Sequence, residues 1–181
     1  LLLQDHMLAG ARNDNERLYY LGYALEQMRG TFYRQVMFSE FELAIHEAVE
    51  RGEALTGSRM TQIYGEILKR YHGHDAGVMT ITDREMIEWA YIPHFYYNFY
   101  VYQYATSIAG AAYFVDRLKS GSDTARETYI KFLEAGGSDY PLNILRSAGL
   151  DMTNRIPYDA VIDRMDAVMD EIESILDARG S

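Results

Sequence analysis

Proline occurs at only three of the 181 positions, so little in this chain interrupts a helix. Apolar residues recur every three or four positions over long stretches, which is the spacing of one buried helix face. The clearest stripe predicts a helix over 158–179, with acidic residues on the opposite face. Further helices are predicted over 15–51, 58–71, 122–135 and 142–148, and Gly30 is a place where the first of them could bend. The sequence therefore predicts an all-α fold.

Composition excludes several classes of function. The chain carries 17 Lys and Arg against 27 Asp and Glu, a formal net charge of −10, so phosphate groups of nucleic acids or anionic lipids would be repelled. It contains no cysteine, which excludes disulfides, thiolate nucleophiles and cysteine metal sites. Its length suits one domain or one lobe of a larger protein.

The first three residues are all leucine, with no methionine before them and no basic segment or cleavage pattern after them. This pattern is not that of a signal peptide. We interpret it as part of a buried helix, and we expect the chain to be a fragment of a larger helical protein.

No Asp, Glu, Lys or Arg occurs between positions 89 and 115, a stretch long enough to span a bilayer. A proline, a histidine, an asparagine, a glutamine and six tyrosines between Tyr91 and Tyr104 argue against a membrane span, because their polar groups would lack partners in lipid. We instead predict a tyrosine-rich central helix, buried on most sides, whose polar tips point into an internal cleft.

His94 follows Pro93 and leads the run of tyrosines. Such neutral hydrogen-bond donors can stabilise the oxyanion of a tetrahedral intermediate in a site of low dielectric constant. Among these side chains we expect Tyr96 and Tyr100 to contact a substrate. The alternative is an aromatic core helix whose hydroxyls are satisfied by neighbouring helices.

A second candidate is the glycine pair Gly136 and Gly137, which ends the predicted helix over 122–135. Backbone amides exposed there could bind a peptide or an anion. The alternative is an ordinary turn between two helices, with Pro141 starting the second helix.

Metal chemistry finds little support in the sequence. His46-Glu47-Ala48-Val49-Glu50 differs from a helical His-Glu-x-x-His zinc motif at its last position. The pattern is more typical of a solvated helix end with mixed charges. His72, His74 and Asp75 lie in a glycine-rich loop, and we assign them no role.

Four strings in register resemble the C-terminal region of oligoendopeptidases F, in the thimet oligopeptidase family of zinc metallopeptidases. They are RGTFYRQVMFSEFE (29–42), IPHFYYNFYVYQYA (92–105), FLEAGGSDYP (132–141) and AGLDM (148–152). The resemblance implies an all-helical lobe of a deep-channel peptidase that cleaves short peptides in the cytoplasm. Family members hold zinc with the two histidines of a His-Glu-x-x-His helix and a glutamate from the next helix.

These zinc ligands have no counterpart in the 181 residues. The resemblance therefore implies one helical domain over 1–181, the C-terminal part of the catalytic region without its zinc-binding helices. We expect zinc in the full-length parent and no metal in this chain. We also expect the chain alone to be inactive, and to self-associate through surface that truncation exposes.

The resemblance also implies roles for individual residues. His94 matches the family histidine, and we align Tyr102 with the tyrosine that donates to the oxyanion. Tyr97 is the second catalytic candidate, with a less direct match because the interval after the histidine is shorter here and lacks glycine. The expected partner is an oligopeptide substrate. The alternative function is a stand-alone helical module that binds a ligand or partner and has no enzymatic activity.

Overall fold

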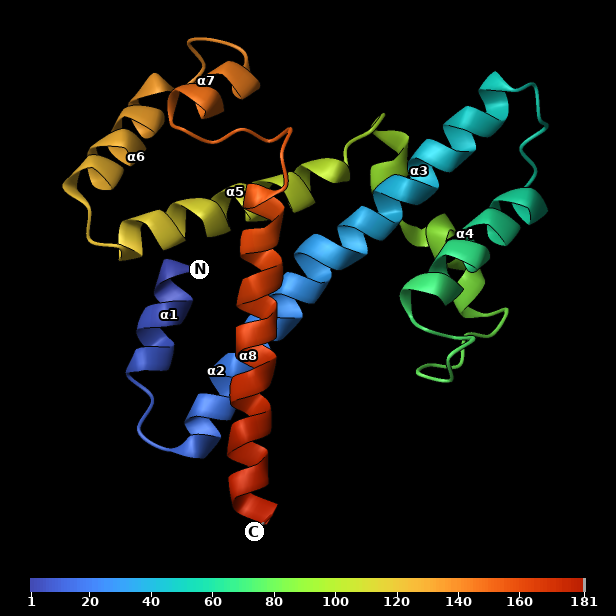
Figure 1. Cartoon of the computed structure of the whole chain (residues 1–181). Coiled ribbons are helices and arrows are strands. Elements are labelled where there is room, and N and C mark those ends of the chain that lie inside the picture. The colour runs from blue at the N-terminus through green and yellow to red at the C-terminus, as the bar shows by residue number, and fades with distance from the viewer. Residues whose placement is uncertain (181) are drawn as a thin grey trace. The chain divides into compact units, whose positions relative to one another are not determined.

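A computed structural model describes residues 1–180 of the chain. This part of the chain contains helices, turns and loops but no strand, so the all-α prediction is confirmed (Figure 1). The α-helices are α1 (Leu2–Ala9), α2 (Asp14–Met28), α3 (Arg34–Glu50), α4 (Gly57–Tyr71), α5 (Tyr102–Lys119), α6 (Asp123–Ala135), α7 (Pro141–Ser147) and α8 (Ile156–Gly180). The chain also contains one π-helical turn, η1 (Arg29–Tyr33). It contains two 3₁₀ segments as well, η2 (Glu85–Tyr91) and η3 (Pro93–Tyr96).

Some helices begin directly after a residue whose side chain caps them. The Asn13 side chain accepts the Glu16 N–H at 3.0 Å and starts α2, and Thr56 accepts the Arg59 N–H at 3.2 Å and starts α4. Each cap satisfies one of the amides that a helix N-terminus leaves without an intrahelical partner. The long helix predicted over 15–51 is interrupted only by η1, a π-helical turn that contains Gly30.

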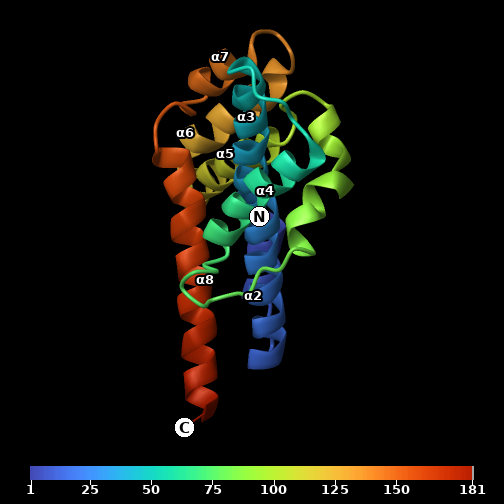
Figure 2. The same cartoon turned by 90° about the vertical axis from the view of Figure 1, so that its right-hand side faces the viewer.

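The chain divides into two compact units. Unit 1 comprises residues 1–32 and the chain from 106 onward, and unit 2 comprises residues 33–105. In unit 1, α2 and α8 lie side by side (Figures 1 and 2). Their buried side chains include Leu21, Ala24 and Met28 of α2 and Val161 and Val168 of α8.

Charged side chains tie three helices of unit 1 together. Asp5 of α1 accepts a hydrogen bond from Lys119 of α5 at 3.0 Å and another from Arg164 of α8. The Arg164 side chain is only 14% exposed, and burial lowers its pKa. Asp5 is therefore the counter-charge that makes burial of this guanidinium tolerable.

A smaller cluster in unit 1 fixes the chain after α7. Phe114 of α5 stacks on Phe132 of α6 with ring centroids 5.1 Å apart, and Leu150 is buried against the same cluster. The Tyr113 hydroxyl donates to the Gly149 carbonyl at 2.6 Å. These contacts hold the segment that follows α7 against α5 and α6.

Unit 2 has its own aromatic core between α3 and α4. The Phe41 ring meets Tyr64 and Phe95 edge to face, with both centroid distances at 5.2 Å. Edge-to-face packing adds to the free energy gained from burial alone. Met37, Phe38, Ile63, Ile67, Leu68, Ile81 and Val101 complete this core.

Polar contacts hold η2 on α4. The Trp89 indole N–H donates to Thr61 at 3.0 Å, and the Tyr64 hydroxyl donates to Glu88, which also pairs with Arg34. Burial, and secondly this hydrogen bond, raises the pKa of Tyr64. The fold thus orders the segment just before the tyrosine run.

The expectation of a buried helix through the whole tyrosine run is wrong. η2 ends at Tyr91, η3 covers 93–96, and regular helix resumes only at Tyr102. Pro93 forces Ile92 into an extended conformation, and the chain next turns through a left-handed segment. The tyrosines are largely exposed, with Tyr96 at 83% and Tyr97 at 62%. The lack of charge in this stretch thus does not reflect burial of its tyrosines.

Candidate functional site

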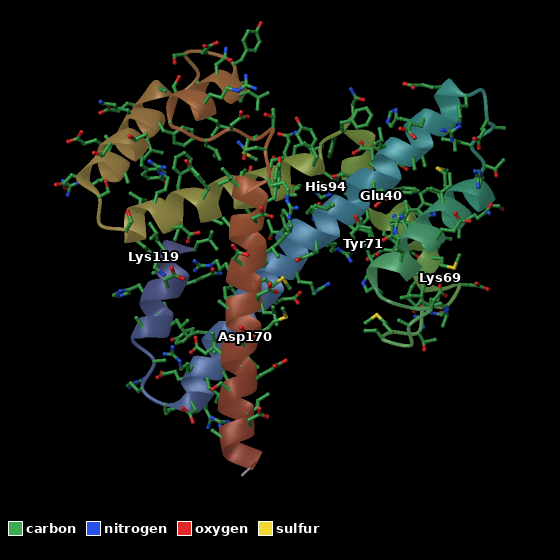
Figure 3. All side chains as sticks on the ribbon, viewed as in Figure 1. Glu40, Lys69, Tyr71, His94, Lys119 and Asp170 are labelled. Atoms are coloured by element: carbon green, nitrogen blue, oxygen red, sulfur yellow. The ribbon has the colours of Figure 1, made fainter. Side chains whose placement is uncertain are left out.

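The site begins with His94, the second residue of η3, whose first residue is Pro93. A proline at the first helical position presets its backbone angle and lacks the N–H that would have no partner there. His94 is therefore presented on a short turn bounded by an extended residue before it and a loop after it (Figure 3).

Three tyrosine rings contact His94. Tyr100 stacks on the imidazole with centroids 5.6 Å apart, whereas Tyr104 and Tyr97 meet it edge to face at 5.8 and 6.4 Å. Tyr100 also contacts both of the other tyrosines, at 5.9 Å to Tyr97 and 5.5 Å to Tyr104. We call His94, Tyr97, Tyr100 and Tyr104 the His–Tyr cluster.

The cluster brings His94 together with Tyr97 and Tyr100, and it includes Tyr104, which the sequence analysis did not select. Tyr104 lies on α5, four residues after Tyr100, and a hydrogen bond with Tyr100 raises the pKa of Tyr104. The signal was its spacing from Tyr100, which is that of helical neighbours.

Tyr102 and Tyr96 occupy different positions. On α5, Tyr102 lies two positions before Tyr104, which turns their side chains about 200° apart around the helix axis. Tyr102 is 51% exposed. Its assignment as the oxyanion donor, like the substrate contact assigned to Tyr96, stays a prediction.

The cluster offers phenol and imidazole groups without a carboxylate or ammonium among its members. Phenol hydroxyls and an imidazole N–H can donate to a carbonyl oxygen as negative charge develops on it. The cluster therefore gathers four neutral groups of the kind that can bind a polarised carbonyl.

The predicted glycine pair lies in unit 1, between α6 and α7. Gly136 has φ +49°, a conformation that side chains rarely adopt, and so ends α6. The Asp139 carboxylate accepts the Tyr140 N–H at 2.6 Å and the Asn143 side-chain amide at 3.2 Å, which holds the start of α7.

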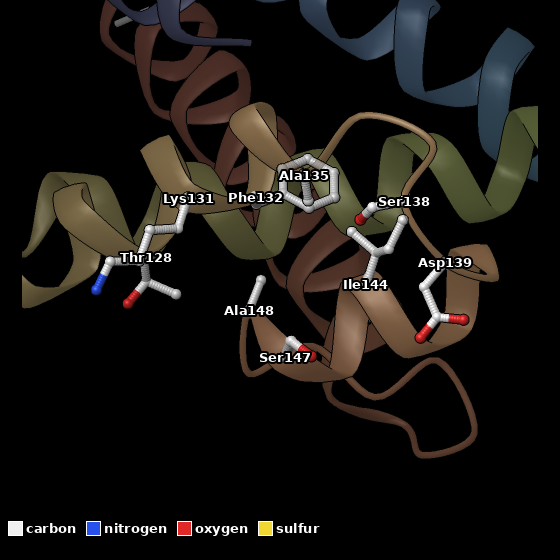
Figure 4. A pocket seen from close by; sticks show the side chains of 9 residues that line it. All are labelled: Thr128, Lys131, Phe132, Ala135, Ser138, Asp139, Ile144, Ser147 and Ala148. Atoms are coloured by element: carbon white, nitrogen blue, oxygen red, sulfur yellow. The ribbon is translucent and has the colours of Figure 1, made fainter.

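A cavity of about 340 Å³ opens beside this loop (Figure 4). Its walls combine the Phe132 ring and small apolar side chains with three hydroxyls and two charged groups. The lining residues are Thr128, Lys131, Phe132, Ala135, Ser138, Asp139, Ile144, Ser147 and Ala148. The loop containing Gly136 and Gly137 thus borders a space of ligand size, while substrate binding by the two glycines stays a prediction.

Three other histidines, His46, His72 and His74, have structural contacts. The His46 ring lies against Phe99, with centroids 4.3 Å apart. His72 Nδ1 lies 2.9 Å from the Leu68 carbonyl oxygen. His74 Nδ1 accepts the Ile81 N–H at 3.0 Å. Within residues 1–180, no three His, Cys, Asp or Glu side chains are grouped so that they could hold a metal ion.

Within the same residues, none of the helices combines the length and the apolar composition that crossing a bilayer requires.

Comparison with known proteins gives a consistent result. The family model described as "Peptidase family M3" matches residues 1–163. Oligopeptidase PepF of Bacillus subtilis (strain 168) is 40% identical over 176 residues, and group B oligopeptidase PepB of Streptococcus agalactiae is 39% identical over 177. Each alignment covers 97% of this chain but only 26% and 29% of the respective relative.

A solved structure supports the same family relationship. The crystal structure of oligoendopeptidase-F from Enterococcus faecium superposes with a TM-score of 0.86 at 29% identity, covering 96% of this chain and 33% of that one. The resemblance inferred from the four sequence strings is thereby confirmed. The chain spans between about a quarter and a third of the length of these relatives.

Proposed function

The chain belongs to peptidase family M3, and from this membership we propose that it is the C-terminal, substrate-binding part of a zinc-dependent oligoendopeptidase. Its relatives are named as oligopeptidases or oligoendopeptidases, and it aligns with only part of each. The proposed substrates are short peptides, and the proposed location is the cytoplasm. Residues 1–181 together would form one functional portion of the catalytic region.

The observation that carries the proposal is the His–Tyr cluster. A peptide carbonyl placed beside His94 would lie next to an imidazole and the rings of three tyrosines, each of which carries a hydroxyl donor. Attack on that carbonyl moves negative charge onto its oxygen, and donors fixed in advance stabilise the charged state more than the starting peptide. His94, with Tyr97 and Tyr104, would therefore act on the oxyanion, and Tyr100 would orient the His94 ring by stacking.

Zinc is the cofactor that the family resemblance implies, and the residues of this chain do not fit it. Residues 1–180 offer no group of three metal-binding side chains, and the His46–Glu50 motif ends in glutamate. His46 instead packs against Phe99. The roles proposed for the residues of this chain therefore do not require the chain itself to bind a metal. We expect the chain alone to be inactive.

Substitutions in the full-length protein encoded around this chain test the proposal. Replacing a donor to an oxyanion costs about 10²–10³-fold in kcat. We expect His94→Ala and Tyr104→Phe to lower kcat for a fluorogenic oligopeptide by this factor, with smaller changes in KM. The kcat of Tyr102→Phe should be measured as well, because Tyr102 is the tyrosine aligned with the family's oxyanion donor. Comparing it with the kcat of Tyr104→Phe shows which of the two tyrosines contributes to catalysis.

Tyr19→Phe is the matched control, because Tyr19 is 69% exposed on α2 and should leave kcat unchanged. Unchanged kcat in both the His94 and the Tyr104 variants would refute the oxyanion role.

The alternative, a stand-alone helical binding module, is distinguished by the encoding gene. An encoded His-Glu-x-x-His helix followed by a glutamate, upstream of Leu1, supports the peptidase. A native start codon at Leu1 supports the module.

A further inference from the structure

Glu42 of α3 is the one charged side chain that is fully buried in residues 1–180, with 1% of its surface exposed. A carboxylate removed from water is costly unless hydrogen bonds replace its hydration. Its Oε1 accepts the Phe99 backbone N–H at 2.7 Å, a distance typical of hydrogen bonds to a charged acceptor. A buried carboxylate therefore faces the loop that follows η3.

That loop is strained at the same point. Asn98 and Phe99, with φ of 46° and 57°, are the two non-glycine residues of the described chain in the left-handed region. Phenylalanine has no polar side chain with which to stabilise this conformation locally. Such strain persists only where surrounding contacts hold it.

His46 supplies a second contact from the same face of α3. It lies one helical turn after Glu42, and its ring packs against the Phe99 ring at 4.3 Å between centroids. Phe99 is thus held by its backbone through Glu42 and by its ring through His46.

The residues on either side of this turn belong to the His–Tyr cluster. Tyr97 directly precedes Asn98, and Tyr100 directly follows Phe99. We infer that Glu42 and His46 are positioning residues that hold the left-handed turn at Asn98 and Phe99 and thereby place Tyr97 and Tyr100 beside His94. The significance of this placement for catalysis rests on the proposed function, whereas the placement itself does not.

Nuclear magnetic resonance on the 181-residue chain tests the placement directly. Glu42→Gln keeps the size of the side chain but removes the charge from the acceptor. We expect hydrogen exchange of the Phe99 amide to accelerate about tenfold, and the ring signals of Tyr97 and Tyr100 to shift. Tyr104 should also titrate at lower pH, because its contact with Tyr100 loosens.

Glu40→Gln is the matched control, because Glu40 lies on the same helix but bonds to Arg70 and Tyr71 of α4. It should leave the Phe99 amide and the cluster signals unchanged. Phe99 exchange and tyrosine signals unaffected by Glu42→Gln would overturn the inference.

If Glu42→Gln does not fold, His46→Ala tests whether the contact between the His46 and Phe99 rings positions the turn. Shifts confined to Phe99, Tyr100 and their neighbours are expected, and their absence would overturn the role of His46.

Kinetics of the full-length protein separate this inference from the proposed function. If wild type hydrolyses oligopeptides, Glu42→Gln should lower kcat several-fold with KM nearly constant, and Glu40→Gln should alter neither. An unchanged kcat despite displaced tyrosine signals would overturn the catalytic significance. If wild type shows no hydrolysis, the proposed function fails, and the resonance experiment still decides whether Glu42 and His46 place the tyrosines.

Discussion

Among single residues, Tyr71 has an ionisation that the structure links directly to folding. Its hydroxyl donates to Glu40 at 2.9 Å, and Glu40 also pairs with Arg70 (Figure 3). Burial, followed by this hydrogen bond, raises the pKa of Tyr71 to about 12. In the unfolded chain the phenol titrates near 10, so at intermediate pH the folded state keeps a proton that the unfolded state has released.

The first prediction concerns stability at alkaline pH. The contribution of Tyr71 should be complete below about pH 10 and be lost as pH rises toward 12. Tyr71→Phe should flatten this part of the profile, and Glu40→Gln should lower the pH at which Tyr71 ionises. Phenolate absorbance and urea unfolding across the range measure both effects. Glu47→Gln, also on α3, is the control and should leave the Tyr71 titration in place.

Some of the candidate residues could be predicted from the sequence, but the backbone conformation that places them could not. His94 and Tyr97 could be chosen as candidates because a proline, a histidine and neutral donors stand together in the sequence. The left-handed turn at Phe99 could not, because it depends on Glu42, 57 positions earlier in the chain. Nothing local at Phe99 favours that backbone conformation.

At the scale of helices, predicted and observed boundaries agree where caps are visible. The prediction of 58–71 became α4 at Gly57–Tyr71, and 122–135 became α6 at Asp123–Ala135. Thr56 and Ser122 each provide the first side-chain acceptor, and such signals are local. The stretch over 89–101 lacked them, and its broken helix follows from Pro93 and from packing of the loop on α3.

A prediction at this scale concerns the contacts of Asp5, which link α1 to α5 and α8. Asp5→Ala leaves the partly buried Arg164 without its carboxylate and removes the bond to Lys119, so the free energy of unfolding should fall by about 2 kcal/mol. Asp170→Ala on the exposed face of α8 is the matched control, with an expected change below about 0.5 kcal/mol (Figure 3). Chemical denaturation measures the free energy of unfolding of both variants. An equal decrease in the two would contradict a stabilising role for the Asp5 contacts.

At the scale of the whole molecule, the chain contains two compact units with separate cores. The domain assignment of 1–181 as one portion of a peptidase remains a proposal. Large apolar and aromatic side chains are nevertheless exposed, including Leu3 at 71% and Tyr91 at 78%. Exposed apolar surface of this kind favours association in water.

The prediction at this scale is that the chain self-associates as its concentration rises. Light scattering during size-exclusion chromatography should show a mass above 20.8 kDa that grows with loading. Leu2→Lys combined with Leu3→Lys should reduce the association. A constant monomer mass at high concentration would contradict the prediction.

The hydrogen bond from Trp89 to Thr61 has a practical consequence for measuring such effects. Trp89 is the single tryptophan of the chain, and it is partly buried against the core of unit 2. Its fluorescence therefore reports the environment of that unit, whereas far-ultraviolet circular dichroism reports helices of both. If the two signals change at different denaturant concentrations, the units unfold in separate steps, and the order of those steps can be determined without attaching any label.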